Sequence, residues 1–414
     1  MRMKGLKNAV VLLACMLAGS ALVVGTAGAQ EPYNLGVALG LSGPGTLYSM
    51  DGIKAIELAV DEINAQGGML GKHPVKLFVR DTLTRPDAAE RKARELILDD
   101  SVRCILGTYS SACAIAIKPV CREHKVLHIA AISNSENLTK NNFSPYTFSV
   151  VPNTYMQAKA VALGVAKLSK DKEWDEYVTL ASDYEWGRSS QTIFVQILKQ
   201  AAPHLKLKKE FWPTLGETEF YPYIKKISVE EPDFVYGSLA SKDNELWLNQ
   251  AKTFGFFELF PYQGSLISVS ELIAQGDMLP RGVIGVCRAP FFAHMDEPMM
   301  SNFVKNYKGR YGQYPSDWAV MEYDAVYALK QGIDKAGTID SEKVKDVMSG
   351  LTIKTTRGRL SFRKIDNQLN CPSYIGMVGK SPDYPFPIYK DLIIIKGEES
   401  WRSETEIQAA RDIK

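Results

Sequence analysis

The chain has 414 residues, 45% of them hydrophobic, and its 49 Lys and Arg nearly balance its 47 Asp and Glu, which gives a formal net charge of +2. This length exceeds one hydrophobic core of ordinary size and favours two domains, because single cores stop growing at roughly 250–300 residues. A balanced charge without a basic block argues against a nucleic-acid-binding protein, which would carry a basic face or a strong excess of cations.

The first 29 residues have the pattern of a secretory signal peptide. Three cationic residues among the first seven precede an apolar run at residues 9–24, and Ala27-Gly28-Ala29 places small residues where a signal peptidase cleaves. We therefore expect export and cleavage after Ala29. Because this segment holds three cations and no anions, the mature net charge becomes 46 − 47 = −1. An exported protein meets no ATP or reduced nicotinamide, so ligand binding is favoured over cofactor chemistry.

The alternative for this segment is a lipoprotein anchored through Cys15. Leu12-Leu13-Ala14-Cys15 half resembles a lipobox, but Leu13 is too large for the second position of that motif. The apolar run also continues well past the cysteine, so a cleaved signal peptide is the preferred interpretation.

From residue 33 strands and helices alternate. Residues 33–40 form an apolar run typical of a buried strand, and the apolar stripe from Ile53 to Ile63 indicates an amphipathic helix that Gly67-Gly68 ends. The same pattern predicts further strands at 75–80, 103–107 and 126–130 and helices at 86–98 and 112–123. Strands separated by single helices require right-handed parallel crossovers, which predicts a doubly wound α/β sheet.

A second α/β series of similar size begins near residue 151. It predicts helices at 155–168, 187–200, 220–229 and 243–254, and strands at 177–181, 205–211, 233–236 and 259–263. The pattern then changes to a strand at 282–286, helices at 300–311, 317–336 and 341–349, and β-rich sequence to residue 395. This order suggests that the chain returns to its first domain rather than starting a third.

The sequence lacks the common signatures of catalysis and metal binding. It has no His-Glu-x-x-His and no Gly-x-Ser-x-Gly, and its five histidines never approach metal-ligand spacing with carboxylates or cysteines. We expect no catalytic residue, no metal and no cofactor. Five cysteines follow the expected cleavage site, so at least one is a free thiol, and their pairing stays open. Apolar runs around most of them indicate small buried hydrophobes: Cys104, Cys113, Cys121, Cys287 and Cys371.

Several segments together carry a family resemblance. In chain order they include Leu35-Gly36-Val37-Ala38-Leu39-Gly40-Leu41-Ser42-Gly43, Ile63-Asn64-Ala65-Gln66-Gly67-Gly68, Ile105-Leu106-Gly107-Thr108-Tyr109-Ser110-Ser111, Asp183-Tyr184-Glu185-Trp186-Gly187 and Tyr323-Asp324-Ala325. In this order and spacing, residues 33 to about 390 resemble the type I periplasmic solute-binding proteins of the branched-chain amino-acid receptor group. The resemblance implies two doubly wound parallel-sheet lobes joined by three hinge crossovers, with a ligand cleft between them. Lobe 1 would comprise residues 30–151 and 284–375, and lobe 2 residues 152–283 and 376–414.

The resemblance also implies a function without catalysis. It predicts a monomeric periplasmic receptor that closes on a small amino-acid-like or carboxylate ligand and delivers it to an ABC permease at the inner membrane. A second hypothesis is a ligand-sensing module of the same fold that is coupled to a membrane signalling partner. The sequence does not separate these two, whereas an exported enzyme has little support.

Two polar loops follow predicted strands of lobe 1. Tyr109, Ser110 and Ser111 lie between a strand and the next helix, where free amides and the positive end of the helix dipole suit an anion such as a carboxylate. Ser133 and Asn134 follow the next strand, and in similar proteins this loop also meets the ligand's carboxylate. Plain N-capping by the two helix-start serines is the alternative, and the resemblance favours binding.

Three aromatic residues complete the predicted pocket. By the resemblance, Tyr48, placed just before the first helix, closes one wall, and Trp186 covers the ligand from lobe 2. Trp318, at the start of a helix, matches another apolar contact position. Taken as a bare sequence feature, Tyr48 is more often a surface aromatic.

One departure from the family leaves a ligand's amine without an obvious partner. Relatives that hold an α-amino acid place a Glu after the strand near residue 263, whereas this chain reads Gly264-Ser265-Leu266. Asp183 could replace it, because a buried ammonium requires a paired charge or several acceptors, and a solvated surface Asp is the alternative. Ser238 could add one hydrogen bond. The ligand is then either an amino acid or an amine-free carboxylate, amide or aromatic acid.

Overall fold

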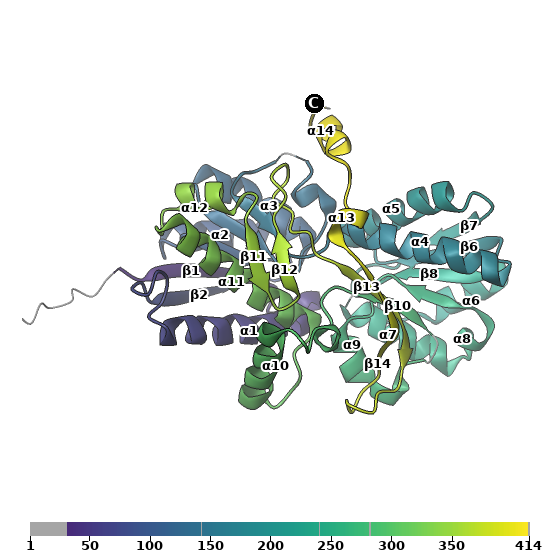
Figure 1. The fold of residues 1–414 in the computed structure, drawn as a ribbon. Helices are drawn as coiled ribbons and strands as arrows, with labels where there is room; N and C mark the ends of the chain where they lie inside the picture. Colours follow the sequence, from purple (N-terminus) through teal and green to yellow (C-terminus); the bar gives the residue numbers. More distant parts are fainter. Residues whose placement is uncertain (1–30, 142, 240, 281–282, 413–414) are drawn as a thin grey trace, which may run out of the picture.

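The computed structural model describes residues 31–141, 143–239, 241–280 and 283–412, and it has two lobes side by side (Figure 1). The expected signal peptide, with Cys15, lies outside these residues. Among the described helices, none is both long and apolar enough to cross a membrane. The predicted α/β fold with two lobes is confirmed.

Lobe 1 is built on a five-stranded parallel sheet in the order β2-β1-β3-β4-β5. Its strands are β1 (Tyr33–Leu39), β2 (Val75–Asp81), β3 (Cys104–Gly107), β4 (Leu127–Ala130) and β5 (Thr147–Ser149), and its first helices are α1 (Thr46–Ala65), α2 (Pro86–Leu98) and α3 (Ser111–Glu123). The chain later returns with α10 (Pro298–Tyr311), α11 (Asp317–Ala336), α12 (Ser341–Met348) and the hairpin β11 (Thr352–Thr355) and β12 (Gly358–Ser361). Helix α11 packs along α1, so the late segment covers the first sheet.

Lobe 2 is built on a seven-stranded sheet in the order β14-β13-β10-β9-β8-β6-β7. Its strands are β6 (Glu176–Ala181), β7 (Lys206–Phe211), β8 (Phe234–Ser238), β9 (Tyr262–Gly264), β10 (Ile284–Cys287), β13 (Ser373–Gly379) and β14 (Ile388–Ile395). In this sheet β13 pairs antiparallel with both β10 and β14. Its helices are α4 (Thr154–Lys172), α5 (Glu185–Ala201), α6 (Tyr221–Glu230), α7 (Ser241–Thr253), α8 (Phe256–Leu259), α9 (Val269–Gln275) and α13 (Gly397–Ser400), and α14 (Glu404–Asp412) projects from the body of the molecule (Figure 1).

The chain crosses between the two sheets three times, after β5, after β10 and between β12 and β13. The expected division, which gave residues 284–375 to lobe 1, differs from the strand pairing at both ends. Strand β10 pairs in parallel with β9 and therefore lies in the lobe 2 sheet, and β13 already begins at Ser373. The physical reason is that β10 is hydrogen-bonded within the lobe 2 sheet, so the crossover to lobe 1 begins only after this strand ends. The expected boundary lay at the first residue of β10 instead.

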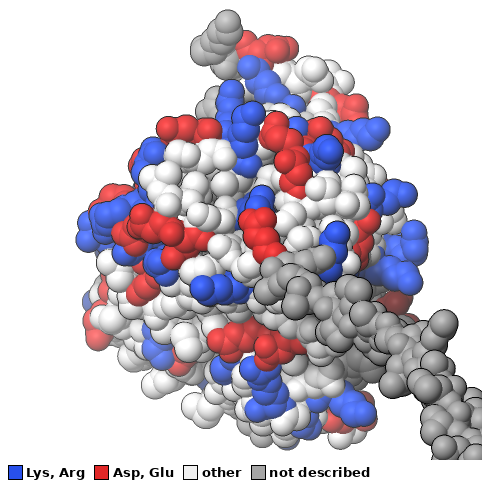
Figure 2. Space-filling model, turned by 90° about the vertical axis from the view of Figure 1, so that its left-hand side faces the viewer, with Lys and Arg blue, Asp and Glu red and all other residues white. Residues whose placement is uncertain are grey.

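The core has the composition that a parallel sheet covered by helices requires. Leu35, Val37 and Leu39 on one face of β1 and Ala38 on the other are fully buried, as expected for a strand covered on both faces. The five described cysteines are all buried and free, which agrees with their interpretation as small hydrophobes. On the surface at the lobe 1 end, cations and anions are interspersed rather than gathered into one basic face (Figure 2).

Candidate functional site

A small cavity lies between the lobes, where the carboxyl ends of strands from both sheets meet. Its wall consists of Tyr48, Tyr109, Ser111, Ile132, Ser133, Asn134, Tyr184, Trp186, Leu266, Arg288 and Trp318. The cavity volume in this closed arrangement is about 20 Å³, room for little more than one water molecule. Aromatic and polar side chains therefore fill most of the space between the lobes.

The polar part of the lobe 1 wall comes from two loops that follow neighbouring strands. Ser111 begins α3 directly after the β3 loop, and its Oγ accepts the amide of Ser135 at 3.1 Å, which leaves its own proton free to donate. Ser133 follows β4, and its Oγ is buried without a hydrogen-bond partner in the described chain. Asn134 donates to the carbonyl of Pro152 at 2.8 Å and to Gln157 at 3.0 Å, so it joins lobe 1 to lobe 2. Two hydroxyl donors thus stand beside the start of α3.

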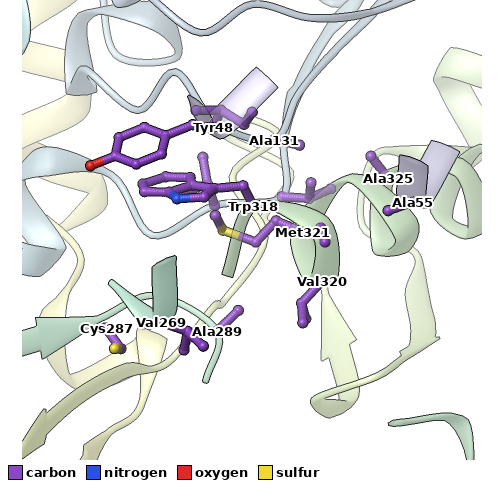
Figure 3. Packing of buried hydrophobic residues seen from close by; sticks show 14 of the residues in the cluster. Tyr48, Ala55, Ala131, Val269, Cys287, Ala289, Trp318, Val320, Met321 and Ala325 are labelled. Atoms are coloured by element: carbon purple, nitrogen blue, oxygen red, sulfur yellow. The ribbon is translucent and has the colours of Figure 1, made fainter. Parts of the chain in front are cut away.

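The aromatic part of the lobe 1 wall is a stacked pair. Tyr48 and Trp318 lie one above the other with ring centroids 4.4 Å apart (Figure 3). Tyr48 was expected before the first helix, but it lies inside the first turn of α1, because that helix already begins at Thr46. Trp318 lies at the start of α11, as expected. A flat, desolvated surface of this kind suits a planar or apolar ligand group.

Lobe 2 contributes aromatic side chains from the end of β6. Tyr184 is the N-cap residue of α5, and Trp186 lies in its first turn with 4% of its surface exposed. Burial holds the pKa of Tyr184 well above its ordinary value, so its hydroxyl stays protonated. The indole Nε1 atoms of Trp186 and Trp318 have no hydrogen-bond acceptor within the described residues.

Arg288 is the one charged side chain in the cavity wall. It follows β10 at the second crossover, and its guanidinium lies 5.0 Å from the ring of Trp318 and 5.8 Å from that of Trp186. Its Nη1 donates to the carbonyl of Ile132 at 2.9 Å, and its Nε donates to Gln157 at 2.9 Å. These bonds fix the plane of the guanidinium and leave Nη2 without a hydrogen-bond partner among the described residues.

Arg288 has no carboxylate partner of its own. Only 3% of the residue is exposed, and no salt bridge of the described chain includes its guanidinium. Burial lowers the pKa of Arg288 to about 10, a value that still keeps it charged at neutral pH. A buried, unpaired cation is costly, so an anion that enters the cavity would gain a strong and specific partner.

Two buried carboxylates lie next to the wall without lining the cavity. Glu271, in the first turn of α9, accepts the hydroxyl of Tyr48 across the lobes and also the amide and hydroxyl of Ser268. Asp317 accepts the backbone amide of Arg288 at 3.5 Å, and burial raises its pKa to about 7. Neither carboxylate is paired with the guanidinium, although burial also raises the pKa of Glu271.

Seven of the ten predicted site residues line the cavity, namely Tyr48, Tyr109, Ser111, Ser133, Asn134, Trp186 and Trp318. The other three do not. Ser110 is the N-cap residue of α3 but makes no side-chain cap, and Ser238 is buried at the end of β8. Asp183 turns to the surface, where its carboxylate binds Arg188 at 2.6 Å and has a lowered pKa for that reason. This position matches the alternative given above for Asp183, a solvated surface carboxylate.

Sequence reasoning missed Arg288, Tyr184 and Leu266. The signal for Arg288 was present, since it is a single cation that follows a predicted apolar strand and precedes Ala289-Pro290. The rule that ligands lie beyond the carboxyl ends of parallel strands would have selected it.

Comparison with known proteins adds relatives that match most of the chain. Residues 32–382 match the profile of a family described as periplasmic binding protein. Leu/Ile/Val-binding protein homolog 7 of Brucella suis is 25% identical over 377 residues, which cover 87% of this chain and 92% of that protein.

Solved structures share the fold. A periplasmic binding protein from Burkholderia mallei superposes with a TM-score of 0.81 at 21% identity and covers 91% of this chain and 98% of its own. A solute-binding protein of an ABC transporter from Rhodopseudomonas palustris, solved in complex with 4-hydroxybenzoate, has a TM-score of 0.79 at 20% identity and covers 90% of this chain and 99% of its own.

Proposed function

Because the chain belongs to the periplasmic binding protein family, we propose that it captures a small carboxylate between its lobes and delivers it to an ABC permease. Members of this family and their structural neighbours are substrate-binding proteins, not enzymes, and the family implies a periplasmic location. The ligand class and the delivery step are the parts that this proposal adds.

The observation that carries the proposal is Arg288. It is a buried guanidinium in the wall between the lobes, and no carboxylate of the described chain forms a salt bridge with it. The groups around it are donors as well: the hydroxyls of Ser111 and Ser133 and the indole N–H of Trp186. A wall that holds a guanidinium and three further groups able to donate is complementary to a carboxylate, which accepts hydrogen bonds at both oxygens.

Capture would follow from hinge closure. Polar bonds that cross the lobes, such as Asn134 to Gln157 and Arg288 to the carbonyl of Ile132, form only when the lobes meet. The stacked pair of Tyr48 and Trp318 supplies the apolar wall for the rest of the ligand. In the closed state the cavity is too small for an organic acid, so binding requires the walls to move apart by a small amount.

A thermal-shift panel tests the ligand class. The purified protein is heated with 4-hydroxybenzoate, benzoate, aliphatic acids and amino acids, each next to its uncharged amide or alcohol. A ligand that binds only the folded state stabilises it by about 2.7 kcal/mol at 100 times its Kd, a readily measured shift in Tm. We expect at least one carboxylate to raise the Tm while its uncharged analogue does not. Stabilisation by the uncharged analogue alone would contradict the proposal.

Delivery is tested separately in cells. Uptake of the radiolabelled acid by the source bacterium should fall when the gene for this protein is deleted and return when the gene is restored on a plasmid. Undiminished uptake in the deletion strain, at ligand concentrations near the measured Kd, would contradict a role in import.

A further inference from the structure

The cavity wall contains a cation but no anion. None of its lining residues is an aspartate or a glutamate, so a ligand's ammonium would find no carboxylate in direct contact. A buried ammonium without a paired charge is strongly unfavourable. The wall offers an ammonium only neutral acceptors, such as Asn134 Oδ1, so the paired charge for an amine would have to come from the buried carboxylates next to the wall.

Glu271 is the carboxylate that hydrogen-bonds to a lining side chain, and both of its oxygens already accept hydrogen bonds. Its Oε1 accepts the Tyr48 hydroxyl, and its Oε2 accepts both the amide of Ser268, at 2.8 Å, and the hydroxyl of Ser268. Only 3% of Glu271 is exposed. A ligand's ammonium could reach this carboxylate only by displacing the tyrosine hydroxyl.

Tyr48 is held where it makes this bond. It lies in the first turn of α1, is 1% exposed, and stacks on Trp318 at 4.4 Å. Both rings belong to lobe 1, whereas Glu271 belongs to lobe 2, so closure itself brings the hydroxyl onto the carboxylate.

The second buried carboxylate is less suited to hold an ammonium. Asp317 begins α11, is fully buried, and accepts the backbone amide of Arg288 at 3.5 Å without lining the cavity. An ammonium placed against it would also lie close to the guanidinium of the same arginine, and like charges repel at that distance.

We propose that Tyr48 is a specificity-determining residue: its hydroxyl occupies Glu271 in the closed state and so restricts the site to carboxylates that lack an amine. This inference rests on the proposed function and narrows its ligand class. Tyr48 does so through a hydrogen bond between the lobes, not through a direct steric block of the ligand.

Matched ligand pairs test the inference by calorimetry. In 3-phenylpropionate and L-phenylalanine, and in 4-methylpentanoate and L-leucine, the two members differ only by the α-amine. In the wild-type protein we expect the amine-free member of the better pair to bind about 30-fold more tightly or more. The Tyr48→Phe variant keeps the stacked ring but frees Glu271, so the preference should fall at least about tenfold.

A double variant separates the roles of the two residues. Adding Glu271→Gln to Tyr48→Phe removes the negative charge that would hold an ammonium, so the preference for the amine-free acid should return. Where a variant does not fold, as judged by its Tm, tighter binding of the amino acid by the wild type still overturns the inference.

The outcomes separate this inference from the proposed function. Tighter binding of the amino acid by the wild type overturns this inference alone, and so does an unchanged ratio in a folded Tyr48→Phe variant. If a full panel of small carboxylates gives no binding at all, the proposed function fails and the inference fails with it.

Discussion

Replacing Arg288 by Met removes the one charge in the cavity wall and keeps much of the apolar stem. In the closed structure its Nη1 and Nε already bind the carbonyl of Ile132 and the amide oxygen of Gln157, so Nη2 is the nitrogen left to meet a ligand. The proposed function therefore predicts a selective loss of affinity for anions in this variant.

The magnitude follows from the burial of the residue. At 3% exposure the guanidinium is screened little by solvent, and truncating one partner of a buried charged pair costs about 2–5 kcal/mol. Part of that free energy comes from the hydrogen bonds of Arg288 to Ile132 and Gln157, which the substitution also removes and which are not bonds to the ligand. We therefore expect binding of the acid to weaken by about 2–4 kcal/mol, or about 30- to 1,000-fold in Kd. The Arg288→Lys variant keeps the charge without the planar fork and should lose less.

Isothermal titration calorimetry measures both variants with the acid that gives the largest thermal shift. The uncharged amide of the same acid is the control, since its weak binding should change little in Arg288→Met. Circular dichroism and the Tm of the ligand-free protein show whether each variant is folded. A folded Arg288→Met protein that binds the acid with wild-type Kd would refute the assignment of this residue to the ligand.

Three further changes have different expected results. Glu322 is buried in α11 without a hydrogen-bond partner in the described chain, and burial raises its pKa from 4.5 to about 8. The folded state thus keeps a proton that the unfolded state loses, so the contribution of Glu322 to stability is greatest below pH 4.5 and falls by about 3 kcal/mol up to pH 7, a part of the pH slope that Glu322→Gln should remove. Equal pH slopes in urea titrations of the two proteins would contradict this. Ser133→Ala should raise the Kd for the acid about 5- to 30-fold with little change in Tm, because it removes one donor to a charged oxygen, and an unaltered Kd would exclude that donor. Asp183→Asn should leave the Kd unchanged, because this carboxylate is 43% exposed and pairs with Arg188. A marked loss of affinity in this variant would show that Asp183 takes part in binding.

Long periodic elements could be predicted from the sequence because their signals are local. Helices α2 and α11 match the predicted ranges 86–98 and 317–336, and both begin with residues suited to a first turn, Pro86 and Asp317. Some elements too short to show a period were missed. These include β5, with three residues, and α9, with seven.

From local patterns alone, the site could be predicted only where strand ends could, whereas the aromatic wall was expected from the family resemblance. Ser111 and Ser133 follow strands that the apolar runs located, and both line the cavity. Contacts between distant segments could not be inferred, since Tyr48 and Glu271 are 223 positions apart and no local pattern links them. Asp183 shows the opposite error, because a loop at a strand end also holds residues that turn to solvent.

The most direct test is a crystal structure of the protein with its best-binding acid. The account predicts that the ligand's carboxylate lies between the lobes within hydrogen-bonding distance of Nη2 of Arg288 and of the Ser133 hydroxyl, with its apolar part against Trp318. A carboxylate bound elsewhere, with Arg288 turned away from it or paired with Asp317 instead, would contradict the account.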